Sequence, residues 1–249
     1  MSDKTNKTTV DINTPPIAEK KDSVIVTHGH TRIDPYFWMR LTDEQKDAAN
    51  PDAQTQNVLD YLNAENAYTN FKLKHTEALQ EKLYNEMVGR IKEDDASVPY
   101  FENGYWYYTK YEKGKEYPIH CRKKGNLDTE EQIMLNVNEL AEGQNYYAAA
   151  GLAVSPDNKI LAFSEDVVSR RIYTVRFKNL ETGEFLPDKI ENTDGGGAWA
   201  NDNQTFFYTT KNEVSLLSEK IFRHKLGTPT GDDFIVYFER DPSFYIGVY

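Results

Sequence analysis

A 45-residue repeat constrains the fold of this chain more than any other feature. Residues 155–159 (SPDNK), followed by an apolar stretch, recur as residues 200–204, so that Asn158 and Asn203 are 45 positions apart. A second strand pattern and a glycine turn follow in both copies. Repeats of about 40–50 residues that hold about four short strands are typical of β-propeller blades. A β-sandwich of the same composition would not repeat in this way.

The repeat predicts three blades, over residues 97–145, 146–195 and 196–240, of which the first is a weaker copy that begins near Asn103. A fourth blade is expected to open at residues 244–249. Propellers have roughly four to eight blades, and a repeat buries its faces only against its neighbours. We therefore expect this sequence to be the amino-terminal part of a longer protein, with an exposed strand edge.

The residues before the repeats favour helix. Between Asp52 and Lys92 there is no proline and the only glycine is Gly89, while apolar residues such as Leu79 and Leu83 follow the spacing of a one-faced helix. One continuous helix and two helices with a break near His75 are equally compatible with this pattern. Beyond residue 97 the apolar period changes to 2, which predicts an all-β region with turns such as Asn103-Gly104.

The expected organisation therefore has three parts. Residues 1–16 are predicted to be a disordered arm, because they are polar and contain Pro15-Pro16. Residues 17–93 form a helical segment, whose early aromatic cluster at 36–39 needs a packing partner. Residues 97–249 form the propeller blades. The fold class is mainly β with an α-helical amino-terminal arm and a partial propeller.

Composition excludes several classes of function. The net charge of −11 and a pI near 5.0 argue against nucleic-acid binding, which requires a basic surface. The mean hydropathy of −0.73 and the lack of a run of about 20 apolar residues argue against a membrane protein. A single cysteine, Cys121, and a polar amino terminus without a secretory signal predict a cytoplasmic location.

No catalytic, cofactor-binding or metal-binding residue is expected in this chain. None of its serines lies in a G-x-S-x-G elbow, the sharp turn that exposes a hydrolase nucleophile. The triplet Gly195-Gly196-Gly197 fits a dinucleotide-binding pattern formally, but the following residues break any helix, so that a connection between blades is the better interpretation. His28 and His30 lack the further ligands of a metal site, which favours a structural or exposed role.

Other chemistry-bearing residues have ordinary interpretations. Cys121 lies beside Arg122 and two lysines and could be an activated thiol, but a buried strand cysteine is the commoner case. The acidic runs 93–95 and 130–131 are expected to be solvated turns. The aromatic run 105–108 is expected in a blade core. The sequons at Asn6 and Asn203 are incidental without a secretory signal.

Several segments of this chain form a recognisable set: 27–40 (THGHTRIDPYFWMR), 58–66, 104–107, 116–119, 169–173, 179–183, 199–202 and 223–229. Together they resemble the oligopeptidase B (protease II) branch of the prolyl oligopeptidase family of serine peptidases. The resemblance covers essentially all of residues 15–249, in the family's order.

This resemblance implies an α/β-hydrolase domain capped by a seven-bladed propeller, with the amino-terminal helices packed on the hydrolase domain. Members cleave short peptides with a Ser-Asp-His triad in the carboxy-terminal domain, after Arg or Lys in the oligopeptidase B branch and after Pro in the prolyl branch. The triad would lie beyond residue 249, so no catalytic residue can be transferred, and we expect these residues alone to be inactive. The partners implied are oligopeptides and the carboxy-terminal domain. The alternatives are a stand-alone binding module or a pseudoenzyme remnant.

Overall fold

The computed structural model describes residues 12–212 and 214–249. Most of the expected amino-terminal arm, residues 1–11, lies outside the described residues. The described chain divides between Ile91 and Lys92 into two compact units, each of which is considered by itself.

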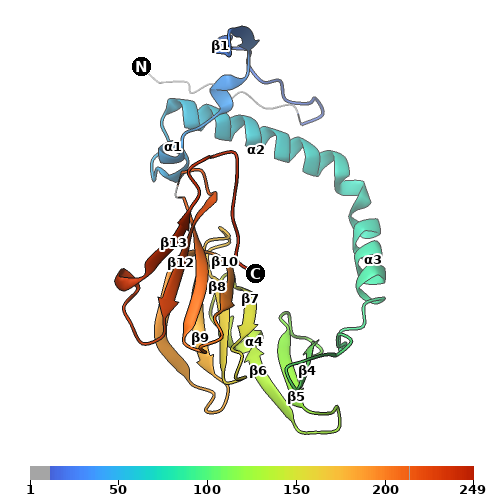
Figure 1. The fold of residues 1–249 in the computed structure, drawn as a ribbon. Helices are drawn as coiled ribbons and strands as arrows, with labels where there is room; N and C mark the ends of the chain where they lie inside the picture. Colours follow the sequence, from blue (N-terminus) through green and yellow to red (C-terminus); the bar gives the residue numbers. More distant parts are fainter. Residues whose placement is uncertain (1–11, 213) are drawn as a thin grey trace, which may run out of the picture. The chain divides into compact units, whose positions relative to one another are not determined.

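The first unit begins with a hairpin and continues as helices (Figure 1). Strands β1 (Ser23–Thr27) and β2 (His30–Asp34) pair through a two-residue turn, in which His28 and Gly29 both have positive φ. This is the conformation that a tight hairpin requires. The remaining elements are η1 (Phe37–Met39), α1 (Asp43–Asp47), α2 (Ala53–Leu73), η2 (Lys74–Thr76) and α3 (Glu77–Val88).

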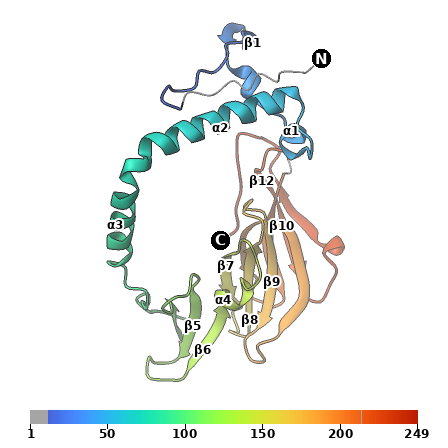
Figure 2. The same ribbon diagram turned by 180° about the vertical axis from the view of Figure 1, so that it is seen from behind.

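The sequence determines where these helices begin and where they break. Thr42 and Gln45 form a reciprocal capping box at the start of α1, and Asp52 accepts a hydrogen bond from the backbone of Thr55 at the start of α2. Of the two alternatives that the sequence left open, the structure has the break near His75, as the 3-10 turn η2, so the segment forms two helices (Figure 2). The hydroxyl of Thr76 donates to the Leu73 carbonyl at this turn, 2.6 Å away.

The described residues of the second unit form eleven strands in two antiparallel sheets. The first sheet has the order β3 (Tyr100–Glu102), β4 (Tyr105–Lys110), β5 (Ile119–Lys124) and β6 (Glu131–Asn136), followed by α4 (Val137–Leu140). The second sheet runs in chain order from β7 to β13 and includes the short turn η3 (Thr230–Asp232). Its strands are β7 (Ala148–Val154), β8 (Ile160–Asp166), β9 (Tyr173–Asn179), β10 (Phe185–Trp199), β11 (Thr205–Lys211), β12 (Ser218–Lys225) and β13 (Phe234–Phe238).

Strand β10 joins two blades. Its first part pairs with β9, for example Ile190 with Val175, and its second part pairs with β11, for example Trp199 with Phe206. The seven-stranded sheet is therefore two four-stranded blades that share one long strand (Figure 1). We call the sets β3–β6, β7–β10 and β10–β13 blades 1, 2 and 3. The predicted fold class, a partial propeller with a helical arm, is confirmed.

One local expectation takes a different form and another differs from the structure. Residues 195–197, expected as a connection between blades, do connect blades 2 and 3, but as part of the continuous strand β10. A Cβ on Gly197 would clash with the Phe206 ring, so close packing explains this glycine. Residues 244–249, expected to open a fourth blade, form no strand. The first strand of a blade is stabilised by pairing with the strand that follows it. In place of a strand pairing, a backbone bond holds this segment: the Ile246 amide donates to the Ser218 carbonyl of β12, 3.1 Å away.

Apolar cores lie between consecutive blades. Tyr107 and Leu135 of blade 1 pack with Phe163 of blade 2, and this is the core position expected for the aromatic run 105–108. Phe177 of blade 2 packs against Phe206 of blade 3, with ring centroids 5.4 Å apart and nearly perpendicular planes. Such edge-to-face contacts stabilise aromatic cores beyond simple area burial.

The repeated asparagines connect the blades. Asn103, Asn158 and Asn203 occupy the turn between the first two strands of successive blades, and all three have positive φ. The Asn158 side chain donates to the Asn103 carbonyl at 3.2 Å, and the Asn203 side chain accepts from the Asp157 amide at 2.8 Å. We call this series the asparagine ladder. The sequence repeat is therefore also a repeated contact between neighbours.

Candidate functional site

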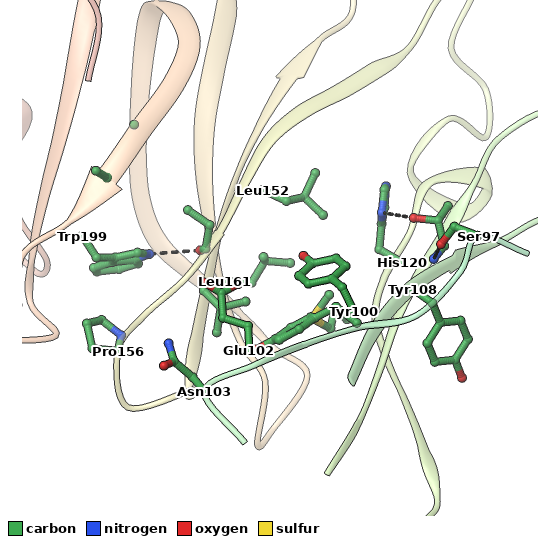
Figure 3. Close-up of a pocket in the computed structure, with 17 residues that line it drawn as sticks. Ser97, Tyr100, Glu102, Asn103, Tyr108, His120, Leu152, Pro156, Leu161 and Trp199 are labelled. Atoms are coloured by element: carbon green, nitrogen blue, oxygen red, sulfur yellow. Dashed lines mark hydrogen bonds between the residues drawn. The ribbon is translucent and has the colours of Figure 1, made fainter. Parts of the chain in front are cut away.

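A groove lies where the first strands of three blades meet (Figure 3). It has a volume of about 450 Å³. Residues of β3, β7 and the second part of β10 contribute to its lining, together with residues of β4, β5, β6 and β8. We call it the blade groove. A concave site lined by aromatic residues and a few polar groups is the usual form of a ligand site.

Aromatic side chains give the blade groove its shape. Tyr100 of β3 stacks on Tyr107 of β4, with centroids 5.5 Å apart. Trp199 lies toward the other end of the close-up, where its indole Nε1 donates to the Ala153 carbonyl at 3.0 Å (Figure 3). This bond joins blade 3 to blade 2 and fixes the indole orientation. The groove walls therefore come from three blades that hold one another in place.

The charge of the blade groove is negative. Among the described residues that line it, Glu102 is the only carboxylate and none is a lysine or arginine. Burial lowers the pKa of His120, which favours the neutral imidazole, and the Thr109 hydroxyl lies 3.2 Å from its Nδ1. Burial raises the pKa of Tyr100, with a further contribution from Glu102.

Blade 3 contains a buried cluster that sequence reasoning did not single out. His224 is fully buried, with its Nδ1 2.8 Å from Asp233 and its Nε2 3.0 Å from Asp188. Both ring nitrogens can donate only when the imidazole is protonated. The Tyr208 hydroxyl also donates to Asp233, at 2.7 Å. These residues come from β10, β11, β12 and the loop before β13. Because Asp188 lies in the part of β10 that pairs with β9, the cluster ties blade 3 to blade 2. Because His224 and Asp188 are 36 residues apart in the sequence, no local sequence pattern indicates that they pair.

The structure does not gather the histidines His28 and His30 into a larger cluster. Both are exposed, in the hairpin turn and at the start of β2. Within residues 12–212 and 214–249, no group of three or more His, Cys, Asp or Glu side chains could hold a metal ion.

The Cys121 thiol is fully buried. Burial raises its pKa to about 12, which outweighs the opposing effect of Lys110, so the thiolate is scarce at neutral pH. The interpretation as a buried strand cysteine is therefore confirmed, and an activated thiol is not supported.

The acidic runs differ from one another. Glu130 is exposed as expected, but the expectation of a solvated turn is wrong for Glu131, which lies half-buried on β6. Its carboxylate pairs with Lys110 at 2.5 Å and accepts from the Tyr108 hydroxyl. In the run 93–95, Glu93 accepts from the Gly114 amide at 3.1 Å and Asp95 pairs with Lys92.

The remaining candidates have structural roles or lie outside the description. Gly195-Gly196-Gly197 is followed by strand β11 and no helix, so the geometry of a dinucleotide site is absent there. Asn203 belongs to the asparagine ladder, and the sequon at Asn6 lies outside the described residues. Among the described residues, no helix has both the length and the apolar character needed to cross a membrane.

Comparison with known proteins decides the family. The model of the family described as "Prolyl oligopeptidase, N-terminal beta-propeller domain" matches residues 15–249. This chain belongs to the prolyl oligopeptidase family. The resemblance stated from the sequence is thereby confirmed.

Relatives within the prolyl oligopeptidase family match nearly the whole chain but are much longer. Dipeptidyl aminopeptidase BI of Pseudoxanthomonas mexicana is 43% identical over 94% of this chain and 34% of its own length. Protease 2 of Moraxella lacunata is 30% identical over 92% of this chain and 32% of its own length. The structure of oligopeptidase B from Leishmania major aligns with a TM-score of 0.78 at 32% identity, over 94% of this chain and 34% of that one. The chain thus spans about a third of the relatives it matches.

Proposed function

We propose that this chain is the amino-terminal and propeller portion of a serine peptidase that cleaves short peptides after Arg or Lys. The observation that carries the proposal is the match of residues 15–249 to the amino-terminal propeller of the family, combined with relatives three times as long. In this proposal the Ser-Asp-His triad lies in a carboxy-terminal α/β-hydrolase domain, and the propeller restricts entry to oligopeptides. The complete protein acts in the cytoplasm.

Exposed apolar side chains on the helical segment support the proposal of a hydrolase domain that packs against it. Leu79, Leu83, Met87 and Ile91 are each about half exposed or more, although their spacing places them on one side of α3 and its extension. A helix stripe of this composition is stabilised by burial against another element. We propose that residues 17–93 pack on the hydrolase domain.

A second candidate activity comes from one relative's name. The 43% identical protein is called a dipeptidyl aminopeptidase, a peptidase that removes dipeptides from a free amino terminus. An exopeptidase of that kind would require a free substrate amine, whereas an endopeptidase would accept a blocked substrate. The choice of substrate alone therefore distinguishes the two activities.

The test uses the complete protein encoded by the reading frame that contains this chain. Three fluorogenic peptides are compared: an amino-terminally blocked peptide ending in Arg, the same peptide unblocked, and a blocked peptide ending in Pro. The proposal predicts cleavage of both Arg peptides and little cleavage of the Pro peptide, with loss of activity after treatment with a serine-reactive phosphonate. Cleavage of only the unblocked peptide would establish the dipeptidyl aminopeptidase instead.

The 249-residue chain is the matched control in this assay. Because none of its serines lies in a nucleophile elbow, it is expected to cleave none of the three peptides. A reading frame that stops at Tyr249 and gives a stable, monodisperse protein would support a stand-alone binding module. Insoluble material from such a frame would indicate a pseudoenzyme remnant.

A further inference from the structure

We propose that the blade groove is a binding site for an organic cation, the ammonium or guanidinium group of a peptide. Glu102 pairs with the cation, and the rings of Tyr100, Tyr107 and Trp199 surround its apolar stem. That the cation belongs to a peptide rests on the proposed function, whereas the charge preference of the groove does not.

The first support is uncompensated charge. Glu102 is exposed, and no hydrogen bond or ion pair of its carboxylate occurs in the described part of the chain. By contrast, the carboxylates of Glu131 and Glu165 are each paired with a basic side chain on their own sheets. Arg122 is buried, bonded to Gln132 and the Asn158 carbonyl, and does not line the groove, although its charge acts on the pKa of the lining residue Tyr107. Among the described residues that line the groove, a cation would therefore meet one unpaired carboxylate and no lysine or arginine.

The second support is the placement of the aromatic rings. Residues two apart on a strand share a face, so Glu102 projects to the same side of β3 as Tyr100. Tyr100 is paired in register with Tyr107, which adds a second ring to that face. Burial raises the pKa of both tyrosines, and the Glu102 charge raises it further in each, whereas Arg122 lowers it at Tyr107. Figure 3 shows Tyr100 and Glu102 on one strand, with Trp199 and Pro156 beyond them.

The combination selects a class of ligand. Aromatic faces attract ammonium and guanidinium groups, and a nearby carboxylate strengthens this attraction by forming charge-assisted hydrogen bonds. An anionic ligand would be repelled by Glu102, and a neutral apolar ligand would leave the carboxylate to be desolvated without a partner. A volume of about 450 Å³ admits one long basic side chain with its adjoining backbone.

The test measures binding of N-acetyl-arginine amide and N-acetyl-lysine amide by calorimetry. It uses the complete protein with its reactive serine blocked by a phosphonate, so that turnover does not interfere. Wild type is compared with Glu102→Gln, which keeps the shape of the side chain and removes the charge. The matched control is Glu184→Gln, an exposed glutamate outside the groove. Circular dichroism verifies that each variant is folded, and Glu102→Asp provides a second, charge-retaining variant.

The proposal predicts that Glu102→Gln lowers by one the number of cation sites, or weakens one site about tenfold, while Glu184→Gln and Glu102→Asp keep that site. Neutral N-acetyl-norleucine amide should bind the groove at least about tenfold more weakly than the arginine probe. An unchanged number and affinity of sites in Glu102→Gln would overturn the proposal. So would equal binding of the norleucine probe, which would indicate an apolar groove only.

The outcomes separate this inference from the proposed function. If the complete protein cleaves Arg peptides but Glu102→Gln leaves cation binding unchanged, the groove proposal fails and the peptidase proposal stands. If the site is lost in Glu102→Gln but no peptide is cleaved, the peptidase proposal fails and the cation site stands.

Discussion

The repeated β-region and the helical segment bury their apolar residues in different ways. In the blades, Phe163, Phe177 and Phe206 are at most 1% exposed, because each lies between consecutive repeats. In α3, Leu83 and Met87 are 46% and 60% exposed. Each repeat packs against the next repeat in the chain, whereas an isolated amphipathic helix needs another element or domain to cover its apolar face. Substitutions in the two regions should therefore have very different effects on stability.

The largest effect is expected at the junction of blades 2 and 3. Phe177→Ala removes a ring that contacts Trp199, Phe206 and His224. Because the site is fully enclosed and cannot collapse easily, we expect a loss of about 3–5 kcal/mol in the free energy of unfolding. Urea unfolding followed by tryptophan fluorescence measures the change. A loss below about 1 kcal/mol would contradict the tight packing between these blades.

The buried histidine cluster should give the next largest effect. His224→Gln retains a side chain that can donate to one carboxylate, whereas the other, Asp188 or Asp233, keeps only its remaining donor, the Gly227 amide or the Tyr208 hydroxyl. We expect a loss of about 2–3 kcal/mol, because a buried carboxylate that loses a hydrogen-bond donor is destabilised. Replacing both partners together, as in His224→Gln with Asp188→Asn, should restore part of this loss. If the double variant loses more free energy of unfolding than the two single variants lose together, the two residues are not coupled in this way.

A pH-dependent effect is expected at Asp166, at the end of β8. Burial disfavours its charged form, but backbone amides of Val168, Ser169 and Arg171 donate to the carboxylate and outweigh this, so its pKa is lowered in the folded state. A lowered folded pKa stabilises the protein above the unfolded value of about 3.9, and this contribution is lost as the pH falls below it.

Asp166→Asn should therefore cost about 1–2 kcal/mol at pH 7. The difference from wild type should shrink as the pH falls from about 5 to 3. Urea unfolding at several pH values measures it. A difference that is constant over this range would show that the carboxylate charge is not what the amides stabilise.

The asparagine ladder should contribute less, since each rung is a single hydrogen bond. Asn158→Gly preserves the positive φ and removes two side-chain bonds, the one donated to the Asn103 carbonyl and the one accepted from the Tyr107 hydroxyl at 3.3 Å. We expect a loss of about 1 kcal/mol for the glycine variant, and a larger loss for Asn158→Ala, which adds backbone strain. Equal stability of the glycine variant and wild type would show that the asparagines serve only the turn conformation.

The same comparison shows what could be predicted from the sequence. The repeat at Asn158 and Asn203 predicted blades because it reflects a local hairpin that each copy forms by itself. The shared strand β10 was not predicted as one strand, because the three glycines at 195–197 inside it are typical of a turn, and pairing of its second part with β11 overrides that local signal. Glu131 and His224 were also missed as paired residues, since their partners Lys110 and Asp188 lie on other strands. The blade groove depends on three blades meeting, so no single segment indicates it.

The smallest effect is expected on the exposed side of α3, and it sharpens the comparison most. In the 249-residue chain, Leu83→Ala should change the free energy of unfolding by less than about 0.5 kcal/mol, because the side chain is already half exposed. In the complete protein the same substitution should cost about 2–3 kcal/mol, because the proposed hydrolase domain buries the leucine. Glu81→Ala on the same helix is the matched control and should be nearly neutral in both proteins. Equal small losses at Leu83 in both would mean that this side of the helix remains uncovered in the complete protein.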